Sequence, residues 1–361
     1  MKNFGSGEAA VGFLLAAVFG AITTSSALAQ DWQPEFVYGK LQPLPDGFPS
    51  GPITIVAAGE RGSVPGLLAQ RLQEYSKIVT PVPIKVEYHP EFEKYDSWEA
   101  LKYAAGTEGA DEGYVNAIFE SPDDIITLHT SPVMADLGVG LNDLTEVISI
   151  EDHRYAVIQC NDAGWDGTWQ ALVQQIKDNP GEVRYAGGEP GDRLDMVFAE
   201  YMHAQGLGSL YDNAVIAFEN SGDVAARTQA VVACDADVTV TDMDQLITQQ
   251  LGEQVAVLLV TGKRKLAKYK NAPTAADVGI ADDPMSRTMQ VVVPAGVDPL
   301  HVEWLNTLWW KTGRDSYFKA GRVLDQPVNL SNLLDAAESA AWNDAAEAKI
   351  KELTSELGIG Q

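Results

Sequence analysis

Short apolar runs alternate with longer amphipathic segments between residues 52 and 260. The runs are rich in β-branched residues and predict buried strands, whereas apolar residues in the longer segments recur at helical spacing. The predicted strands are residues 52–58, 82–88, 113–119, 147–150, 155–159, 183–186, 214–218, 237–241 and 255–260, and the predicted helices are residues 64–75, 97–105, 168–178, 194–205, 224–234 and 244–251. This alternation indicates an α/β fold with largely parallel sheets covered by helices on both faces.

The C-terminal part follows a different pattern. A strand over residues 288–293 precedes Asp298 and Pro299, which predict the start of a helix that runs to about residue 312. The apolar stripe of this helix is typical of a buried core face rather than of an aromatic ligand site. The stripe consists of Trp304, Leu305, Leu308 and Trp309. Residues 331–357 predict a long Ala-rich helix with Ser331 as its N-cap.

The first 29 residues have the features of a secretory signal peptide. Lys2 is followed by an apolar run over residues 11–22, and Ala27-Leu-Ala29 matches a signal-peptidase site. The run is too short to span a bilayer, and a buried N-terminal helix is the alternative interpretation. We therefore expect export to the periplasm and cleavage after Ala29.

Composition adds a strong negative charge. The chain has 361 residues with 25 Lys and Arg against 51 Asp and Glu, a formal net charge of −26. The phosphate groups of nucleic acids would repel such a surface, so no nucleic-acid partner is expected. The length of the chain suits two domains. In an exported protein Cys160 and Cys234 either form one disulfide or remain two buried thiols, and their spacing does not decide between the two.

Three turns between a predicted strand and a predicted helix are rich in glycine and polar residues. They cover residues 58–63, 187–192 and 219–223, with Ser63, Asp192 and Asp223 at the N-cap positions. Asp195 is placed for a capping box with Asp192. Such turns either bind an anion through free backbone N–H groups at the helix N-terminus or are simply capped turns of an α/β fold.

The sequence lacks the usual signatures of catalysis and metal binding. It has no nucleotide-binding glycine motif and no nucleophile elbow, and its five His residues are scattered without ligand-like spacing. We therefore expect no catalytic residue, metal or cofactor. Glu60 with Asp192 is the one pair of carboxylates that an exported enzyme of this architecture would use.

Several segments together resemble one family, the periplasmic solute-binding proteins of tripartite tricarboxylate transporters, also called Bug proteins. The resemblance covers roughly residues 48–360 and depends on the order and spacing of the segments. These are Pro52-Ile-Thr-Ile-Val56 with Gly62 and Ser63, Asp111-Glu-Gly-Tyr114, Asn179-Pro-Gly-Glu-Val-Arg-Tyr-Ala186 with Gly191, Ala236-Asp-Val238, Val260-Thr-Gly-Lys-Arg264, Pro273-Thr-Ala-Ala-Asp-Val-Gly279 and Val293-Pro-Ala-Gly-Val-Asp-Pro299.

The resemblance implies a monomeric receptor with a two-lobed periplasmic-binding-protein-like fold and a hinge. Domain 1 would comprise residues 30–157 and 263–361, and domain 2 residues 158–262. A small carboxylate would bind in the cleft between the lobes, and closure would present the receptor to the membrane subunits of the permease. The ligand-binding residues implied are Gly59, Glu60, Arg61, Gly62, Ser63, Glu120, Ser121, Gly188, Gly191, Asp192, Arg193 and Asp242.

The turns depart from the family pattern. The first turn of the family usually reads P-G-G-S/T-x-D, whereas this chain has Glu60 and Arg61 there, and Arg193 follows the second turn. The two arginines either bind the ligand as ion pairs or lie exposed on the acidic surface. Glu120 and Asp242 follow strands, and if both are unpaired they would favour a neutral or cationic-ended ligand. The alternative functions are an exported enzyme on the same fold and a receptor domain that feeds a sensor.

Overall fold

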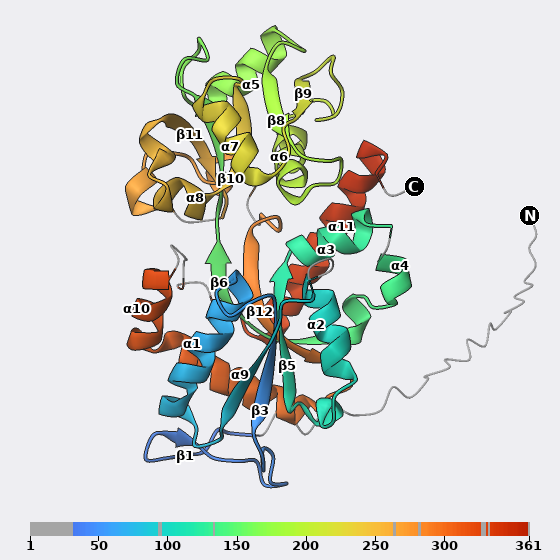
Figure 1. Ribbon diagram of the computed structural model, residues 1–361, viewed down its shortest axis with the longest axis vertical. Helices are drawn as coiled ribbons and strands as arrows, with labels where there is room; N and C mark the ends of the chain where they lie inside the picture. The colour runs from blue at the N-terminus through green and yellow to red at the C-terminus, as the bar shows by residue number, and fades with distance from the viewer. Residues whose placement is uncertain are drawn as a thin grey trace, which may run out of the picture.

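The computed structural model describes residues 32–92, 96–132, 134–262, 265–280, 283–325, 330 and 333–359. The predicted signal peptide and Ser331 lie outside this part of the chain. Two five-stranded sheets lie one above the other, each flanked by helices (Figure 1). We call the part built on the sheet with β3 the first lobe and the part built on the sheet with β8 the second lobe.

The first lobe has the strand order β4-β3-β5-β12-β6. Its strands are β3 (Ile53–Ala58), β4 (Ile84–His89), β5 (Val115–Ser121), β6 (Leu144–His153) and β12 (Arg287–Pro294). β3 runs parallel to β4 and β5, and β12 runs antiparallel to β5 and β6. A hairpin of β1 (Phe36–Val37) and β2 (Lys40–Leu41) precedes the sheet.

Helices cover both faces of the first sheet because successive strand residues point to opposite sides. Ile53 and Ile55 of β3 pack in a cluster with residues of α1 and α9, while Val56 packs in a second cluster with residues of α2 and α11. The helices of this lobe are α1 (Val64–Val79), α2 (Asp96–Ala105), α3 (Asp123–Thr130), α4 (Met134–Leu137), α9 (Pro299–Arg314), α10 (Ser316–Asp325) and α11 (Ala336–Leu357). The stripe of α9 is fully buried, as predicted for Trp304 and Trp309.

The second lobe has the strand order β11-β7-β10-β8-β9. β10 runs parallel to β8, β8 runs parallel to β9, and β7 is antiparallel to both β10 and β11. Its elements are β7 (Tyr155–Cys160), α5 (Trp169–Asp178), β8 (Arg184–Gly187), α6 (Arg193–Ala204), β9 (Ala217–Asn220), α7 (Val224–Val232), β10 (Val238–Asp242), α8 (Met243–Thr248) and β11 (Val255–Val260). Residues of α5 and α6 pack on one face of this sheet and residues of α7 and α8 on the other.

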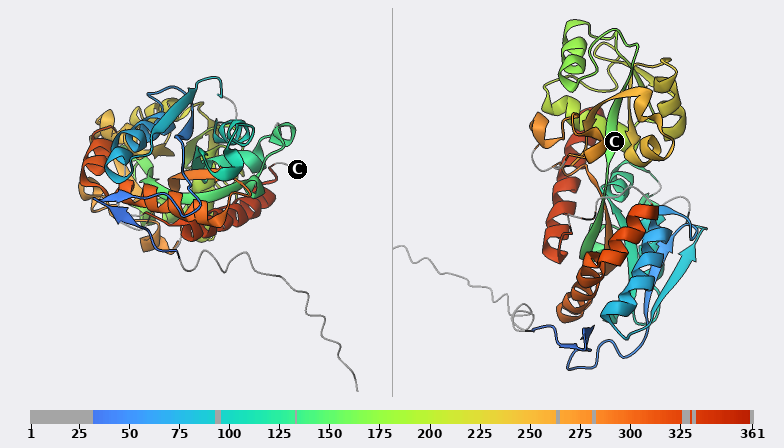
Figure 2. Two further views of the ribbon diagram at one scale, coloured as in Figure 1. Left: turned by 90° about the horizontal axis from the view of Figure 1, so that it is seen from below. Right: turned by 90° about the vertical axis from the view of Figure 1, so that its left-hand side faces the viewer.

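The chain passes from the first lobe to the second at Arg154, which separates β6 from β7, and it returns to the first lobe between β11 and β12. Arg154 is buried and bonds to Asp152 and to the carbonyl oxygen of Thr261, so it joins the outgoing and returning segments. α11 packs against β6 and α3 of the first lobe and against α6 of the second (Figure 2). Short 3₁₀ turns lie at Ala110–Glu112, Leu141–Asp143, Leu251–Glu253, Ala267–Tyr269 and Ala276–Val278.

Most of the predicted elements are present, and the differences are local. Ser63, Asp192, Asp223 and Asp298 are the N-caps that the sequence predicts. The last helix begins at Ala336 with Asp335 as its cap, because Asp335 and Glu338 form a capping box that ends the preceding extended segment. α3 and α10 were not predicted, and β9 begins three residues later than predicted. Residue 157, the predicted end of the first segment of domain 1, lies inside β7. No helix in the described part of the chain is both long and apolar enough to cross a membrane.

Cys160 and Cys234 form a disulfide, which resolves the two alternatives left by the sequence. Their Cα atoms lie 5.3 Å apart, within the normal range for a disulfide. The bond connects the end of β7 to the residues that follow α7, and it closes a loop with a sequence separation of 74.

Replacing both cysteines by alanine should lower the free energy of unfolding by about 2–4 kcal/mol, because the unfolded chain regains the entropy of a long loop. Urea unfolding of the variant and of the native protein, each with and without reductant, measures this difference. Reductant should lower the free energy of unfolding of the native protein and leave that of the variant unchanged. Two titratable thiols in the denatured, unreduced protein would contradict the disulfide.

Candidate functional site

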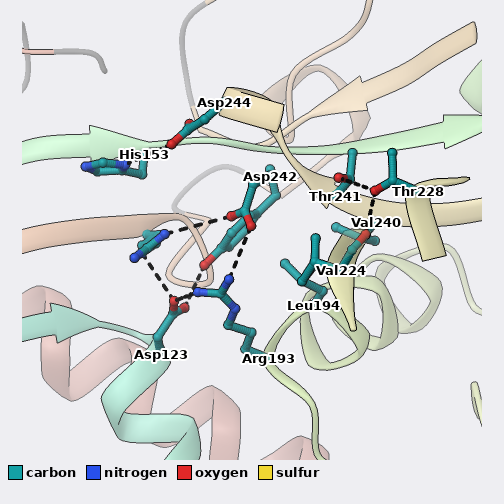
Figure 3. A network of polar contacts seen from close by, with 12 residues as sticks. Asp123, His153, Arg193, Leu194, Val224, Thr228, Val240, Thr241, Asp242 and Asp244 are labelled. Atoms are coloured by element: carbon teal, nitrogen blue, oxygen red, sulfur yellow. Dashed lines mark hydrogen bonds and ion pairs between the residues drawn. The ribbon is translucent and has the colours of Figure 1, made fainter. Parts of the chain in front are cut away.

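Charged side chains from both lobes meet where the lobes face each other (Figure 3). Asp123 is the first residue of α3, directly after β5, and Arg287 is the first residue of β12, and both belong to the first lobe. Arg193 opens α6 and Asp242 ends β10, both in the second lobe. All four charged side chains therefore lie at the end of a strand or the start of a helix, and these ends meet at one place.

Arg193 connects the lobes through its guanidinium group. Its Nη1 lies 2.6 Å from Oδ2 of Asp123, and its Nη2 lies 3.2 Å from Oδ2 of Asp242. The guanidinium also lies over the ring of Tyr155, 6.0 Å from the ring centre. One arginine thus binds a carboxylate from each lobe.

Arg287 binds the same two carboxylates from the other side. Its Nε lies 3.2 Å from Oδ2 of Asp123, its Nη1 lies 3.8 Å from Oδ1 of Asp242, and its Nη2 bonds to Glu120. Asp123 and Asp242 are therefore each shared by two guanidinium groups. We call Glu120, Asp123, Arg193, Asp242 and Arg287 the interlobe network.

The network holds Asp123 in its ionised form. Burial alone would raise the pKa of this carboxyl, but the positive charges of Arg193 and Arg287 keep the pKa below its usual value. The hydroxyl of Tyr155 donates a hydrogen bond of 2.6 Å to Oδ1 of Asp123. Burial and the charge of Asp123 raise the pKa of Tyr155 well above its usual value, so the phenol stays a neutral donor.

A cavity of about 310 Å³ adjoins the network and is lined from both lobes. Its volume is at the lower end of the range for small-molecule sites. Its lining residues are Glu120, Asp123, Asp124, Ile126, Thr127, Gly191, Asp192 and Arg193. Gly191 has a φ of +91°, and a Cβ atom there would lie 3.0 Å from Cβ of Thr130 in α3. Glycine is needed at this position because the lobes approach so closely.

The backbone amides of the second glycine turn, residues 187–192, donate to groups of the protein itself. The N–H of Gly188 donates to Oδ2 of Asp195 at 2.9 Å, and the N–H of Gly191 donates to the hydroxyl of Tyr211 at 3.1 Å. Asp192 caps α6 and forms an ion pair of 3.0 Å with Arg227. The predicted capping box is wrong, because the carboxylate of Asp195 turns back to Gly188 instead of to the N–H of Asp192.

The first glycine turn is also satisfied locally. Arg61 is exposed and its Nε donates to Gln70, while the hydroxyl of Ser63 donates to the carbonyl oxygen of Glu60 and accepts from the N–H of Gly66. Glu60 and Gly62 are exposed and Gly59 is half-buried. Among the described residues, no hydrogen bond or ion pair joins this turn to the interlobe network, and none joins Glu60 to Asp192.

The sequence-predicted site residues therefore separate into two groups. Glu120, Gly191, Asp192, Arg193 and Asp242 lie at the cavity or in the network. The others are Gly59, Glu60, Arg61, Gly62, Ser63, Gly188 and Ser121, whose buried hydroxyl has no hydrogen-bond partner among the described residues. A role in ligand binding stays a prediction for both groups.

Glu120 and Asp242 are not unpaired, because Arg287 binds both. The sequence favoured a neutral or cationic-ended ligand on the condition that both carboxylates are unpaired. This condition is not met.

Sequence reasoning missed Asp123, Tyr155 and Arg287. Asp123 lies just beyond a predicted strand, Arg287 directly precedes one, and Tyr155 opens one. A search for charged and phenolic residues at the ends of every predicted strand would have found all three.

Comparisons with known proteins point to one family. The model of the tripartite tricarboxylate transporter family receptor matches residues 109–321. A TctC solute-binding protein from Polaromonas, solved without ligand, superposes with a TM-score of 0.71 at 15% identity, covering 86% of this chain and 100% of that chain.

Two proteins from Rhodopseudomonas palustris are similar in fold. Rpa4515 with adipate has a TM-score of 0.58 at 15% identity, covering 86% of this chain and 99% of its own. MatC with bound malate has a TM-score of 0.57 at 12% identity, covering 86% of this chain and 100% of its own. A sequence search among curated proteins found no match.

Asp195 should make stability depend on pH. Burial and the neighbouring charge of Asp192 raise the pKa of Asp195 from 3.8 to about 7, against the opposing effect of Arg227. Between these values the native state holds a proton that the unfolded chain has released, so the free energy of unfolding falls as the pH rises. Asp195→Asn should flatten this fall by up to about 1.4 kcal/mol per pH unit.

Urea unfolding at intervals between pH 4 and pH 8 tests the slope rather than the absolute stability, which the substitution also changes. Asp166→Asn alters an exposed aspartate of the same lobe and controls for the loss of one acidic group. Equal slopes for Asp195→Asn and the unsubstituted protein would contradict the raised pKa.

Proposed function

This chain belongs to the tripartite tricarboxylate transporter family of receptors, and we propose that it binds a small organic solute with a carboxylate group between its two lobes. The proposal includes export through the predicted signal peptide with cleavage after Ala29, a monomeric receptor in the periplasm, and delivery to the membrane subunits of a permease. The receptor releases its ligand chemically unchanged.

The observation that carries the proposal is the convergence of two guanidinium groups on shared carboxylates between the lobes. Arg193 donates hydrogen bonds to Asp123 and Asp242. Arg287 lies within ion-pair distance of both carboxylates, and its buried Nε has no hydrogen-bond partner among the described residues, so it is available to a carboxylate oxygen. Guanidinium groups bind carboxylates through strong, directional hydrogen bonds. A ligand carboxylate replaces one of these protein carboxylates on the arginines. The adipate and malate in the two R. palustris proteins support this ligand class.

Ligand binding and lobe closure are coupled in this proposal. The pair between Asp123 and Arg193 joins the lobes directly, so opening of the cleft separates these groups. We propose that the hinge lies at Arg154 and in the returning segment near Thr261, close to the predicted division into residues 30–157 with 263–361 and residues 158–262. A ligand that binds both lobes stabilises the closed form through its higher affinity for that form.

Arg193→Gln and Arg287→Gln should each weaken binding of the carboxylate ligand by at least about 30-fold, because each removes a guanidinium partner of the ligand's charge. A thermal-shift screen of mono-, di- and tricarboxylates that includes adipate and malate identifies a stabilising compound. Calorimetric titration then gives its affinity for each variant. The stabilisation expected at 100 times the Kd is about 2.7 kcal/mol.

Arg314→Gln is the matched control, since Arg314 is an exposed arginine at the C-terminal end of α9 whose guanidinium lies over the ring of Trp310. It should bind the ligand like the unsubstituted protein. Circular dichroism establishes that each variant is folded. Unchanged affinity in folded Arg193→Gln would refute the proposed site, as would a screen of carboxylates, amino acids included, without any stabilising compound.

A further inference from the structure

The interlobe network carries more negative than positive charge. Glu120, Asp123 and Asp242 contribute three carboxylates against the two guanidinium groups of Arg193 and Arg287. All five side chains are largely removed from water, with exposed fractions of 30% for Arg193 and 8–14% for the other four. In this poorly solvated region an excess charge interacts strongly with a ligand.

The cavity beside the network is acidic as well. Its lining residues include four acidic ones, Glu120, Asp123, Asp124 and Asp192, and one basic one, Arg193. Arg287 behind Glu120 and Arg227 behind Asp192 each already bind a further carboxylate, those of Asp123 and Asp195. The arginines of this region are therefore all shared among aspartates and glutamates of the protein.

Asp242 is the carboxylate that an incoming ligand displaces most easily. Its contacts with Arg193 and Arg287 are 3.2 and 3.8 Å, longer than the contacts of 2.6 and 3.2 Å that Asp123 makes. Asp242 occupies the N-cap position of α8, yet its side chain makes no capping hydrogen bond. Its carboxylate therefore faces the arginines rather than the helix.

Displacement leaves Asp242 buried without a cation, which is strongly unfavourable. A second carboxylate on the ligand adds repulsion from the acidic lining. A positively charged nitrogen on the ligand instead provides the partner that Asp242 loses. We therefore propose that the ligand is a small amino-carboxylate, with a carboxylate for the arginines, an ammonium group for the acidic side and a net charge of zero or above. The inference rests on the proposed function, since it assumes a solute bound at this site.

Pairs of compounds that differ in one end group test this inference on the unsubstituted protein. Glutarate is compared with γ-aminobutyrate, and adipate with δ-aminovalerate, because each amino acid has an ammonium group in place of one carboxylate. We expect the amino acid of at least one pair to bind at least about tenfold more tightly than its dicarboxylate by calorimetry. Cadaverine, with two ammonium groups, is the third arm.

Asp242→Asn then tests the assigned partner of the ammonium group. It should weaken binding of the amino-carboxylate by about tenfold or more and strengthen binding of the matching dicarboxylate. Asp166→Asn, an exposed aspartate of the same lobe, should keep the original preference. The ligand pairs remain decisive on the unsubstituted protein even if Asp242→Asn does not fold.

The outcomes separate this inference from the proposed function. Tighter binding of both dicarboxylates than of the amino acids would overturn the inference and leave a carboxylate receptor. Binding of cadaverine alone, or of no compound in this series or in the broad carboxylate screen, would overturn the proposed function as well. An unchanged preference in folded Asp242→Asn would overturn the role of Asp242.

Discussion

Ion pairing between Asp123 and Arg193 across the two lobes is the interaction on which the site depends. Asp123 is buried and Arg193 is largely shielded from water, and a carboxylate in that position is stable only with a partner of opposite charge. The same requirement draws in Arg287 and Asp242 and makes Tyr155 a neutral hydrogen-bond donor. Gly191 permits the close approach of α3 that the pairing needs.

In the proposed site, side chains rather than backbone amides are the groups available to a ligand. The amides of Gly188 and Gly191, which the family resemblance assigned to a ligand, bind Asp195 and Tyr211 instead. The turn thus contains a carboxylate of its own where an external one was expected. The acidic character of the chain extends into the lining of the interlobe cavity.

The fold was largely predictable because its elements depend on local patterns. Strand runs, helical spacing and N-cap residues such as Ser63 and Asp298 lie within a few residues of the structure they determine. The network was only half predictable, since Arg287 and Glu120 are 167 residues apart and meet through the pairing of β12 with β5, which no local pattern specifies. Arg61 was selected for its glycine-rich turn, but its observed partner is Gln70, nine residues along the same segment.

α11 gives the molecule a preferred direction of movement. This long helix packs on β6 and α3 of the first lobe and also contacts α6 of the second lobe. It therefore belongs to the first lobe and supports the second. Rotation of the second lobe about an axis along α11 preserves the packing of α11 against α6, whereas bending across α11 breaks this packing. We therefore expect the receptor to open by a twist about α11 rather than by a bend across it.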